Sequence, residues 1–177
     1  MTEIQEKANT IPQELSIAEI RKYTKEAAPL IHCITNPISI HDCANIILAA
    51  GARPIMAEHP AEVAEITAVA SALMLNLGNI TDARIESIQR ALKEANRRKI
   101  PVLLDLVGVT CSSLRREFAR KLLADGRFAV IKGNISEILA AADLPFHGTG
   151  IDAGSQDAIS QANEERYCTT AKKLAEH

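Results

Sequence analysis

Residues 72–107 read ALMLNLGNITDARIESIQRALKEANRRKIPVLLDLV, and this stretch decides the fold. Two short apolar runs, residues 72–77 and 101–107, flank a longer amphipathic segment, residues 82–99, which is the pattern of a strand, a helix and a second strand. Because a helix between two strands makes a crossover connection, we expect the strands to be parallel. Ligands in open sheets of this kind bind beyond the carboxyl ends of the strands.

The same alternation continues on both sides of this unit. Ser16 and Glu19 have the capping-box spacing, so a first helix is expected from Ser16, whereas residues 1–15 lack periodicity and are expected to form a loose arm. The fold predicted for residues 16–177 is a three-layer α/β domain with a mostly parallel sheet and helices on both faces. We predict further strands at residues 30–35, 53–57 and 128–133, and helices at residues 39–50, 60–70, 112–124, 135–142 and 157–176.

The composition is that of a globular α/β protein. Of the 177 residues, 47% are hydrophobic and only 3% aromatic, so the core must consist of Ile, Leu, Val and Ala. A formal net charge of −2 gives no field that would attract nucleic acid or anionic lipid, and no apolar run approaches the ~20 residues that span a bilayer. We therefore expect a cytoplasmic protein that binds neither nucleic acid nor membrane. Reduced thiols are expected because no disulfide or metal-ligand spacing connects Cys33, Cys43, Cys111 and Cys168.

Candidate functional residues occupy the turns after the first two predicted strands. Asn36 stands before Pro37, which holds it in an extended conformation at the rim of the sheet, where its amide can donate and accept hydrogen bonds. Met56 follows the second strand and offers a flexible, polarizable wall for a flat ring. The pattern leaves open that Asn36 only stabilises a turn and that Met56 only packs in the core.

The turns after the last two predicted strands suit a polyphosphate. Asp105 ends a strand, and Arg115 lies at the start of the next helix beyond a hydroxyl-rich turn; helix N-termini and guanidinium groups both favour anions. Asn134 and Glu137 lie three residues apart at another helix start, so both can face one point and orient the water shell of Mg²⁺. The alternative is a pair of ordinary capped helices with a solvated arginine.

Two common nucleotide-binding motifs are excluded. The sequence contains no GxxxxGK[ST] phosphate loop, and the glycines of residues 148–154 have the wrong spacing for a dinucleotide fingerprint and follow no predicted strand. Phosphate-loop enzymes and NAD-dependent dehydrogenases are therefore disfavoured.

Taken in order, these turns resemble those of the hydroxyethylthiazole kinase family, part of the ribokinase-like superfamily. The resemblance runs from about Pro29 to the C-terminus and is densest in PLIHCITNPISIHDCANIILAAGARPIMAEHPAEVAEI, ALMLNLGNITDARIESI and VIKGNISEI. It implies a homotrimeric kinase of thiamine biosynthesis or salvage that uses ATP and Mg²⁺ to phosphorylate the alcohol of 4-methyl-5-(2-hydroxyethyl)thiazole. Positioning and charge neutralisation dominate such chemistry.

The resemblance also implies roles for six residues and shows two departures. Where many family members read DPVGAGAT, residues 105–112 read DLVGVTCS, which changes the small residues near the nucleotide. The later VTG-x-D segment and GTGC-type loop of the family do not occur in the sequence, so no catalytic residue is assigned, and the chain is expected to be incomplete at its C-terminus and inactive as given. The implied roles are thiazole binding for Met56 and Asn36, ATP binding for Arg115 and Asp105, and Mg²⁺ binding through water for Asn134 and Glu137.

Two other functions stay open at this point. One is a catalytically silent fragment or thiazole-binding module, which only residues beyond His177 would separate from an active kinase. The other is a related kinase for another vitamin alcohol, such as hydroxymethylpyrimidine or pyridoxal, and the turn that contains Met56 argues against it.

Overall fold

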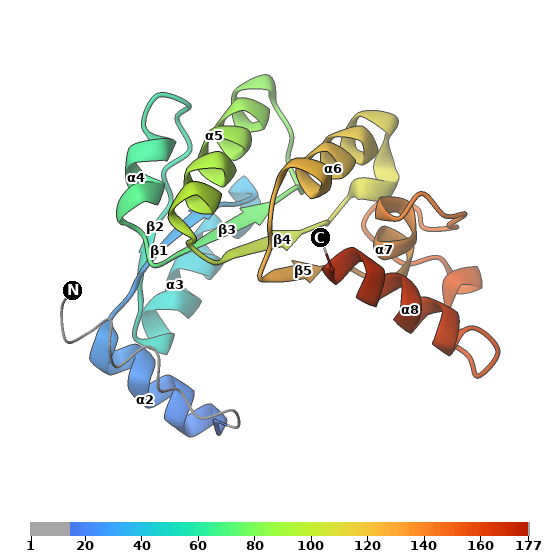
Figure 1. Ribbon diagram of the computed structural model, residues 1–177, viewed down its shortest axis with the longest axis horizontal. Helices are drawn as coiled ribbons and strands as arrows, with labels where there is room; N and C mark the ends of the chain where they lie inside the picture. The colour runs from blue at the N-terminus through green and yellow to red at the C-terminus, as the bar shows by residue number, and fades with distance from the viewer. Residues whose placement is uncertain (1–14, 177) are drawn as a thin grey trace.

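The computed structural model describes residues 15–176, in which five parallel strands form one sheet with helices on both faces (Figure 1). The predicted fold class is confirmed, while nearly all of the arm predicted for residues 1–15 lies outside the described residues. Every neighbouring pair of strands in this sheet is parallel, so the five carboxyl ends meet at one edge. In spatial order, the strands are β2 (Arg53–Ile55), β1 (Leu30–Ile34), β3 (Ala72–Asn76), β4 (Val102–Asp105) and β5 (Val130–Lys132).

The helices divide between the two faces of the sheet. In Figure 1, α4, α5 and α6 cover one face, α2 and α3 lie on the other side, and α7 and α8 lie beyond β5. None of the helices within residues 15–176 combines the length and the apolar character needed to cross a membrane. The α-helices are α2 (Ile17–Ala27), α3 (Ile40–Ala50), α4 (Val63–Val69), α5 (Asp82–Arg98), α6 (Ser113–Asp125), α7 (Ile135–Ala141) and α8 (Glu164–Ala175), and the 3₁₀ turns are η2 (Pro37–Ser39), η3 (Val109–Cys111) and η4 (Ser155–Asp157).

The last helix begins later than predicted. The helix expected from Asp157 starts only at Glu164, and Asp157 itself lies in η4 with 2% exposure. Its carboxylate accepts hydrogen bonds from the hydroxyl of Ser136 and from the backbone N–H of His147. These partners, one of them 21 residues away, hold Asp157 in a turn against α7, and helical periodicity cannot reveal such a long-range constraint.

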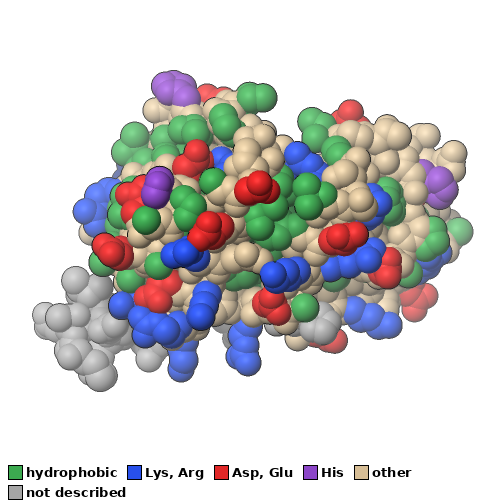
Figure 2. Space-filling model, turned by 90° about the horizontal axis from the view of Figure 1, so that it is seen from above, with side chains coloured by type: hydrophobic (Ala, Val, Ile, Leu, Met, Phe, Trp, Pro, Cys, Tyr) green, Lys and Arg blue, Asp and Glu red, His purple; other side chains and the backbone are tan. Residues whose placement is uncertain are grey.

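The core lies between the sheet and α4–α6. One face of α5 buries residues at helical spacing, and these side chains pack on the strand residues that point the same way. Burying one such Leu or Ile contributes about 1.5–3 kcal/mol. Outside this core, Lys, Arg, Asp and Glu side chains are intermixed over the surface in Figure 2, so the net charge of −2 forms no field of one sign on this face. The buried strand and α5 residues are Leu73, Leu75, Val102, Leu104, Ile88, Ala91, Leu92 and Ala95.

The opposite face of the sheet is covered unevenly. Cys33, Met74, Leu103 and Val130 form one paired row across β1, β3, β4 and β5. Cys33 is buried, Met74 and Leu103 are half-buried, and Val130 is 49% exposed. The cover therefore decreases from β1 towards β5 because, in the described chain, α3 packs at the β1–β2 side.

His32 ties β1 to α4 and to the turn after β2. The imidazole is fully buried; Nε2 donates to the carbonyl of Ala57 at 2.9 Å, and Nδ1 lies 2.8 Å from the Thr67 hydroxyl. A carbonyl can only accept, so we assign the neutral tautomer protonated at Nε2, with the Thr67 hydroxyl donating to Nδ1. Burial lowers the pKa of His32 below its ordinary value of 6.5, against smaller opposing effects of the Ala57 carbonyl and Glu62.

We expect the stability of the fold to depend on pH through His32. The unfolded state binds the proton near pH 6.5 and the folded state only at lower pH, so the free energy of unfolding should be fully present above pH 6.5 and should decrease as the pH falls below it. Urea unfolding between pH 5.5 and 7.5 would measure this slope. The variant His32→Gln should lose most of this pH dependence of the free energy of unfolding. An unchanged slope in that variant would contradict the assignment of the pH dependence to His32.

Candidate active site

The turns at the carboxyl edge of the sheet hold all six residues that the sequence singled out. Asn36 and Met56 follow the adjacent strands β1 and β2, whereas Asp105 ends β4 and the other three lie at the helix starts after β4 and β5. The predicted groups thus lie on one rim, with the thiazole candidates and the phosphate candidates on opposite sides of β3. The phosphate candidates are Asp105, Arg115, Asn134 and Glu137.

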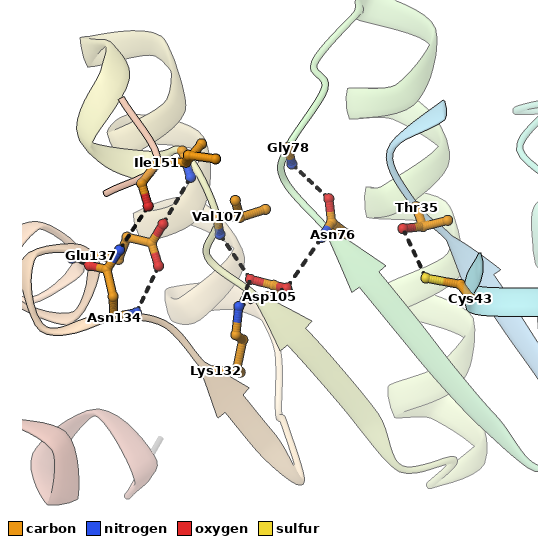
Figure 3. A network of polar contacts seen from close by, with 11 residues as sticks. Thr35, Cys43, Asn76, Gly78, Asp105, Val107, Lys132, Asn134, Glu137 and Ile151 are labelled. Atoms are coloured by element: carbon orange, nitrogen blue, oxygen red, sulfur yellow. Dashed lines mark hydrogen bonds and ion pairs between the residues drawn. The ribbon is translucent and has the colours of Figure 1, made fainter. Parts of the chain in front are cut away.

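Asp105 is the centre of a polar network in the middle of this rim (Figure 3). One carboxylate oxygen accepts from the backbone N–H of Val107 at 3.0 Å, and the other accepts from the Asn76 amide at 3.3 Å. The Lys132 ammonium lies 3.2 Å from the carboxylate and is 60% exposed, so a positive charge faces solvent beside Asp105. Sequence reasoning assigned no role to Asn76 or Lys132. Their shared register with Asp105, as the last residues of β3 and β5, is the signal that unites the three.

Asn134 and Glu137 form a capping box that also reaches the turn after β4. Glu137 is 2% exposed, and its two oxygens accept from the backbone N–H of Asn134 at 2.8 Å and of Gly108 at 3.1 Å. The Asn134 side chain accepts from the N–H of Glu137 at 3.0 Å and donates to the carbonyl of Ile151 at 3.0 Å. Figure 3 shows the side chains of Asn134 and Glu137 near the turn after β4. Glu137 therefore fixes the turn after β4 against the start of α7.

A pocket of about 520 Å³ opens beside this capping box. Residues 151–153, part of the glycine-containing segment that matched no nucleotide motif, form one wall, and the carbonyl of Gly150 accepts from the Thr110 hydroxyl at 2.8 Å. Asp157 anchors this segment. Burial raises the pKa of that carboxyl, but hydrogen bonds from Ser136 and His147 outweigh burial and hold the pKa below its ordinary value. The pocket is lined by Val107, Lys132, Gly133, Asn134, Glu137, Ile151, Asp152 and Ala153.

Asn36 and Met56 border the other half of the rim. The side-chain oxygen of Asn36 accepts from the backbone N–H of Ile38 at 3.0 Å, so this side chain does stabilise its own turn. Its amide nitrogen faces the turn after β3, because a Cβ added at Gly78 would lie 2.9 Å from it. Met56 is half-buried at the start of the turn after β2.

Arg115 is bound to the turn after β3. It is half-buried, and its guanidinium donates to the carbonyls of Leu77 and Gly78, the latter at 3.2 Å. Gly108 allows this approach, because it has a φ of +78° and a Cβ there would lie 3.1 Å from the guanidinium. The arginine is thus held at the rim between β3 and β4, with further N–H groups available to an anion.

The donor set fits a hydrated magnesium ion rather than a metal cage. Within residues 15–176, no three His, Cys, Asp or Glu side chains gather where they could hold a metal ion. Mg²⁺ keeps several waters and commonly takes one or two carboxylates together with substrate phosphates. Each oxygen of Glu137 accepts one hydrogen bond and keeps a second lone pair for such a water contact, whereas each oxygen of Asp105 already accepts two.

Comparison with known proteins gives the same family from sequence and from structure. The chain matches the family model "HK: Hydroxyethylthiazole kinase family" over residues 21–175. It is 52% identical over 157 residues to hydroxyethylthiazole kinase 2 of Clostridium botulinum, covering 89% of this chain and 59% of that protein. Hydroxyethylthiazole kinase of Desulfovibrio desulfuricans is 40% identical over 159 residues, covering 90% of this chain and 56% of that protein. The chain therefore spans less than two thirds of the length of these relatives.

A solved structure has the same fold. Hydroxyethylthiazole kinase from Pyrococcus horikoshii OT3 superimposes with a TM-score of 0.68 and 34% identity, covering 71% of this chain and 49% of that chain. The family model extends from α2, across all five strands of the described sheet, to the end of α8. This chain belongs to the hydroxyethylthiazole kinase family.

Proposed function

We propose that the protein phosphorylates the alcohol of 4-methyl-5-(2-hydroxyethyl)thiazole, with ATP as the phosphoryl donor and Mg²⁺ as the cofactor. The observation that carries this proposal is the division of the rim. The Met56 thioether and the Asn36 amide lie in the turns after β2 and β1, and cationic and acidic groups border those after β4 and β5. Such a rim can hold a flat ring and a polyphosphate side by side, and positioning of this kind dominates phosphoryl transfer.

The thiazole would lie against Met56 and near Asn36. The thioether gives a polarizable contact to the ring, and the Asn36 amide nitrogen supplies a donor beside it. The hydroxyethyl group would then extend past Gly78 towards the row formed by Asn76, Asp105 and Lys132.

The phosphates of ATP would lie over the helix starts after β4 and β5. Lys132 and Arg115 supply positive charge there, and the N-terminus of α6 supplies backbone N–H groups. Asn134 and Glu137 would hold Mg²⁺ through water, and the bound ion would neutralise charge on the phosphates. Glu137 also keeps Gly108 in place, so it would act on the nucleotide turn through the backbone as well.

The cellular setting follows from the same proposal. We place the reaction in thiamine biosynthesis or salvage in the cytoplasm, where reduced thiols are the rule. All four cysteines are free thiols, which supports this compartment. A homotrimer is proposed as well, supported by the exposed apolar side chains Ile38, Ile46 and Leu48 on η2 and α3.

Replacing Met56 with Asp should weaken binding of the thiazole alcohol by about tenfold or more, because a carboxylate at this wall must lose water without gaining a partner. Calorimetric titration measures the affinity, and circular dichroism confirms that the variant is folded. Met56→Leu is the matched control and should bind within about threefold of the unmodified protein, since it keeps an apolar side chain of similar size. Unchanged affinity in a folded Met56→Asp variant would remove Met56 from the pocket.

In a version of the protein as long as its relatives, replacing Glu137 with Gln should lower turnover and raise the Mg²⁺ concentration needed for half-maximal activity. A glutamine has one acceptor oxygen, so it cannot accept from both Gly108 and Asn134, and the turn after β4 loses a fixed contact. Mass spectrometry of the phosphate ester at increasing Mg²⁺ measures both effects. Glu86→Gln, on the exposed side of α5, is the control and should leave both unchanged.

If thiazole affinity fell while the Mg²⁺ requirement stayed constant, the assigned roles would be wrong. Formation of no ester at all by the unmodified protein would favour a thiazole-binding module instead.

A further inference from the structure

Arg84 has the same position and the same kind of contact as two of the site residues, yet nothing so far gives it a role. Arg84, Arg115 and Glu137 are each the third residue of a helix that follows a strand. In each case, the N-cap side chain binds the backbone N–H of this third residue. The side chain of the third residue then contacts the backbone of the turn after the neighbouring strand.

The Arg84 guanidinium joins two turns that are far apart in sequence. One terminal nitrogen donates to the carbonyl of Thr35 at 2.5 Å, and the other lies 2.5 Å from the carboxylate of Glu58. Thr35 immediately precedes Asn36, and Glu58 comes two residues after Met56. One planar cation on α5 therefore holds both turns that border the proposed thiazole pocket.

A second residue of α5 strengthens this connection. Ser87, one turn after Arg84, is fully buried, and its hydroxyl lies 2.7 Å from the carbonyl of Glu58 and 2.7 Å from that of Ala83, so its one proton is shared between the turn and the helix. The turn after β2 is thus held at both the side chain and the backbone of Glu58. Because α5 follows β3 directly, the three turns after β1, β2 and β3 are all fixed to the start of one helix.

The burial of Arg84 shows that the contact is more than a surface ion pair. Its side chain is 4% exposed, whereas that of Glu58 is 50% exposed, and the Arg84 Nε is buried without a hydrogen-bond partner. An exposed pair on the same helix, Arg90 with Glu86, has both side chains about half exposed and reaches no other element through this contact. Burying a guanidinium is costly unless the contacts it makes are well fixed. Unlike Arg90, the buried Arg84 connects two turns of the rim, those after β1 and β2.

We propose that Arg84, together with Glu58, is a positioning residue that sets the separation of Asn36 and Met56 and thereby the fit of the thiazole ring. This inference rests on the proposed function for the identity of the ligand, but the clamp itself is a property of the protein without ligand. Arg84 acts through the backbone of Thr35 and through Glu58, and it does not touch the substrate.

The test combines hydrogen exchange on variants of this chain with steady-state kinetics on the same variants in a version of the protein as long as its relatives. In Arg84→Met, amide exchange should become faster in residues 35–38 and in residues 56–59. The exchange rates of other residues should change little. The KM for the thiazole alcohol should rise about tenfold, the size expected for losing one hydrogen bond to a charged group, while the KM for ATP stays within about twofold. Arg90→Met is the matched control and should change none of these quantities, because Arg90 is exposed and its ion pair lies within its own helix.

Two changes at Glu58 keep the proposal testable if Arg84→Met folds poorly. Glu58→Ala should accelerate exchange at residues 56–59 and leave residues 35–38 as they were, since Arg84 keeps the carbonyl of Thr35. Glu58→Gln should restore the unmodified exchange rates and the thiazole KM within about threefold, because the amide oxygen still accepts from the guanidinium.

The outcomes separate the clamp from the proposed function. Faster exchange in both segments without any thiazole phosphorylation by the unmodified protein would support the clamp and contradict the proposed function. Unchanged exchange in Arg84→Met, in a protein that does phosphorylate the thiazole alcohol, would overturn the clamp. An equal rise of the KM for ATP and for the thiazole alcohol would also overturn it, because a merely destabilising change moves both.

Discussion

The carboxyl edge of this sheet depends on contacts that run sideways from the helix starts. A strand-to-helix turn leaves backbone groups at its end without strand partners, and buried backbone groups need hydrogen bonds. Here the third residue of α5, α6 and α7 satisfies such groups in the neighbouring turn: Arg84 and Arg115 donate to carbonyls, and Glu137 accepts an N–H. A hydrogen bond to a charged group contributes about 1.5–3 kcal/mol, which is a sizeable fraction of the stability of a domain.

The charges of Arg115 and Glu137 suit both the backbone group that each side chain binds and the ligand that we place beside it. A guanidinium that binds a carbonyl still has free N–H groups, so Arg115 can meet a phosphate while it holds Gly78. A carboxylate that binds two N–H groups still has lone pairs, so Glu137 can meet water around a cation while it holds Gly108. Arg115 and Glu137 therefore fix the rim and can also bind ligand, and a rigid rim is what phosphoryl transfer requires.

Sequence reasoning predicted the elements and the rim, but not the contacts between turns. Apolar runs and N-cap residues such as Asn134 are local signals, and they placed the strands, most helices and the candidate residues correctly at one edge. The predicted start of the last helix was wrong because Asp157 binds Ser136 and His147 across a long loop. The contacts of Arg84 were also missed, because its partners become neighbours only when β1, β2 and β3 lie side by side.

The central claim is that the rim binds the thiazole alcohol on one side of β3 and the nucleotide on the other. The chain has three methionines, of which Met56 borders the proposed thiazole pocket and Met74 lies within β3. Methyl resonances of ¹³C-methionine-labelled protein, assigned with Met56→Leu, report on each side chain separately. The account predicts that the thiazole alcohol shifts the Met56 resonance and leaves that of Met74 in place, and that ATP with Mg²⁺ leaves the Met56 resonance unshifted. A Met56 resonance that ignores saturating thiazole alcohol, or that follows ATP instead, would contradict the account.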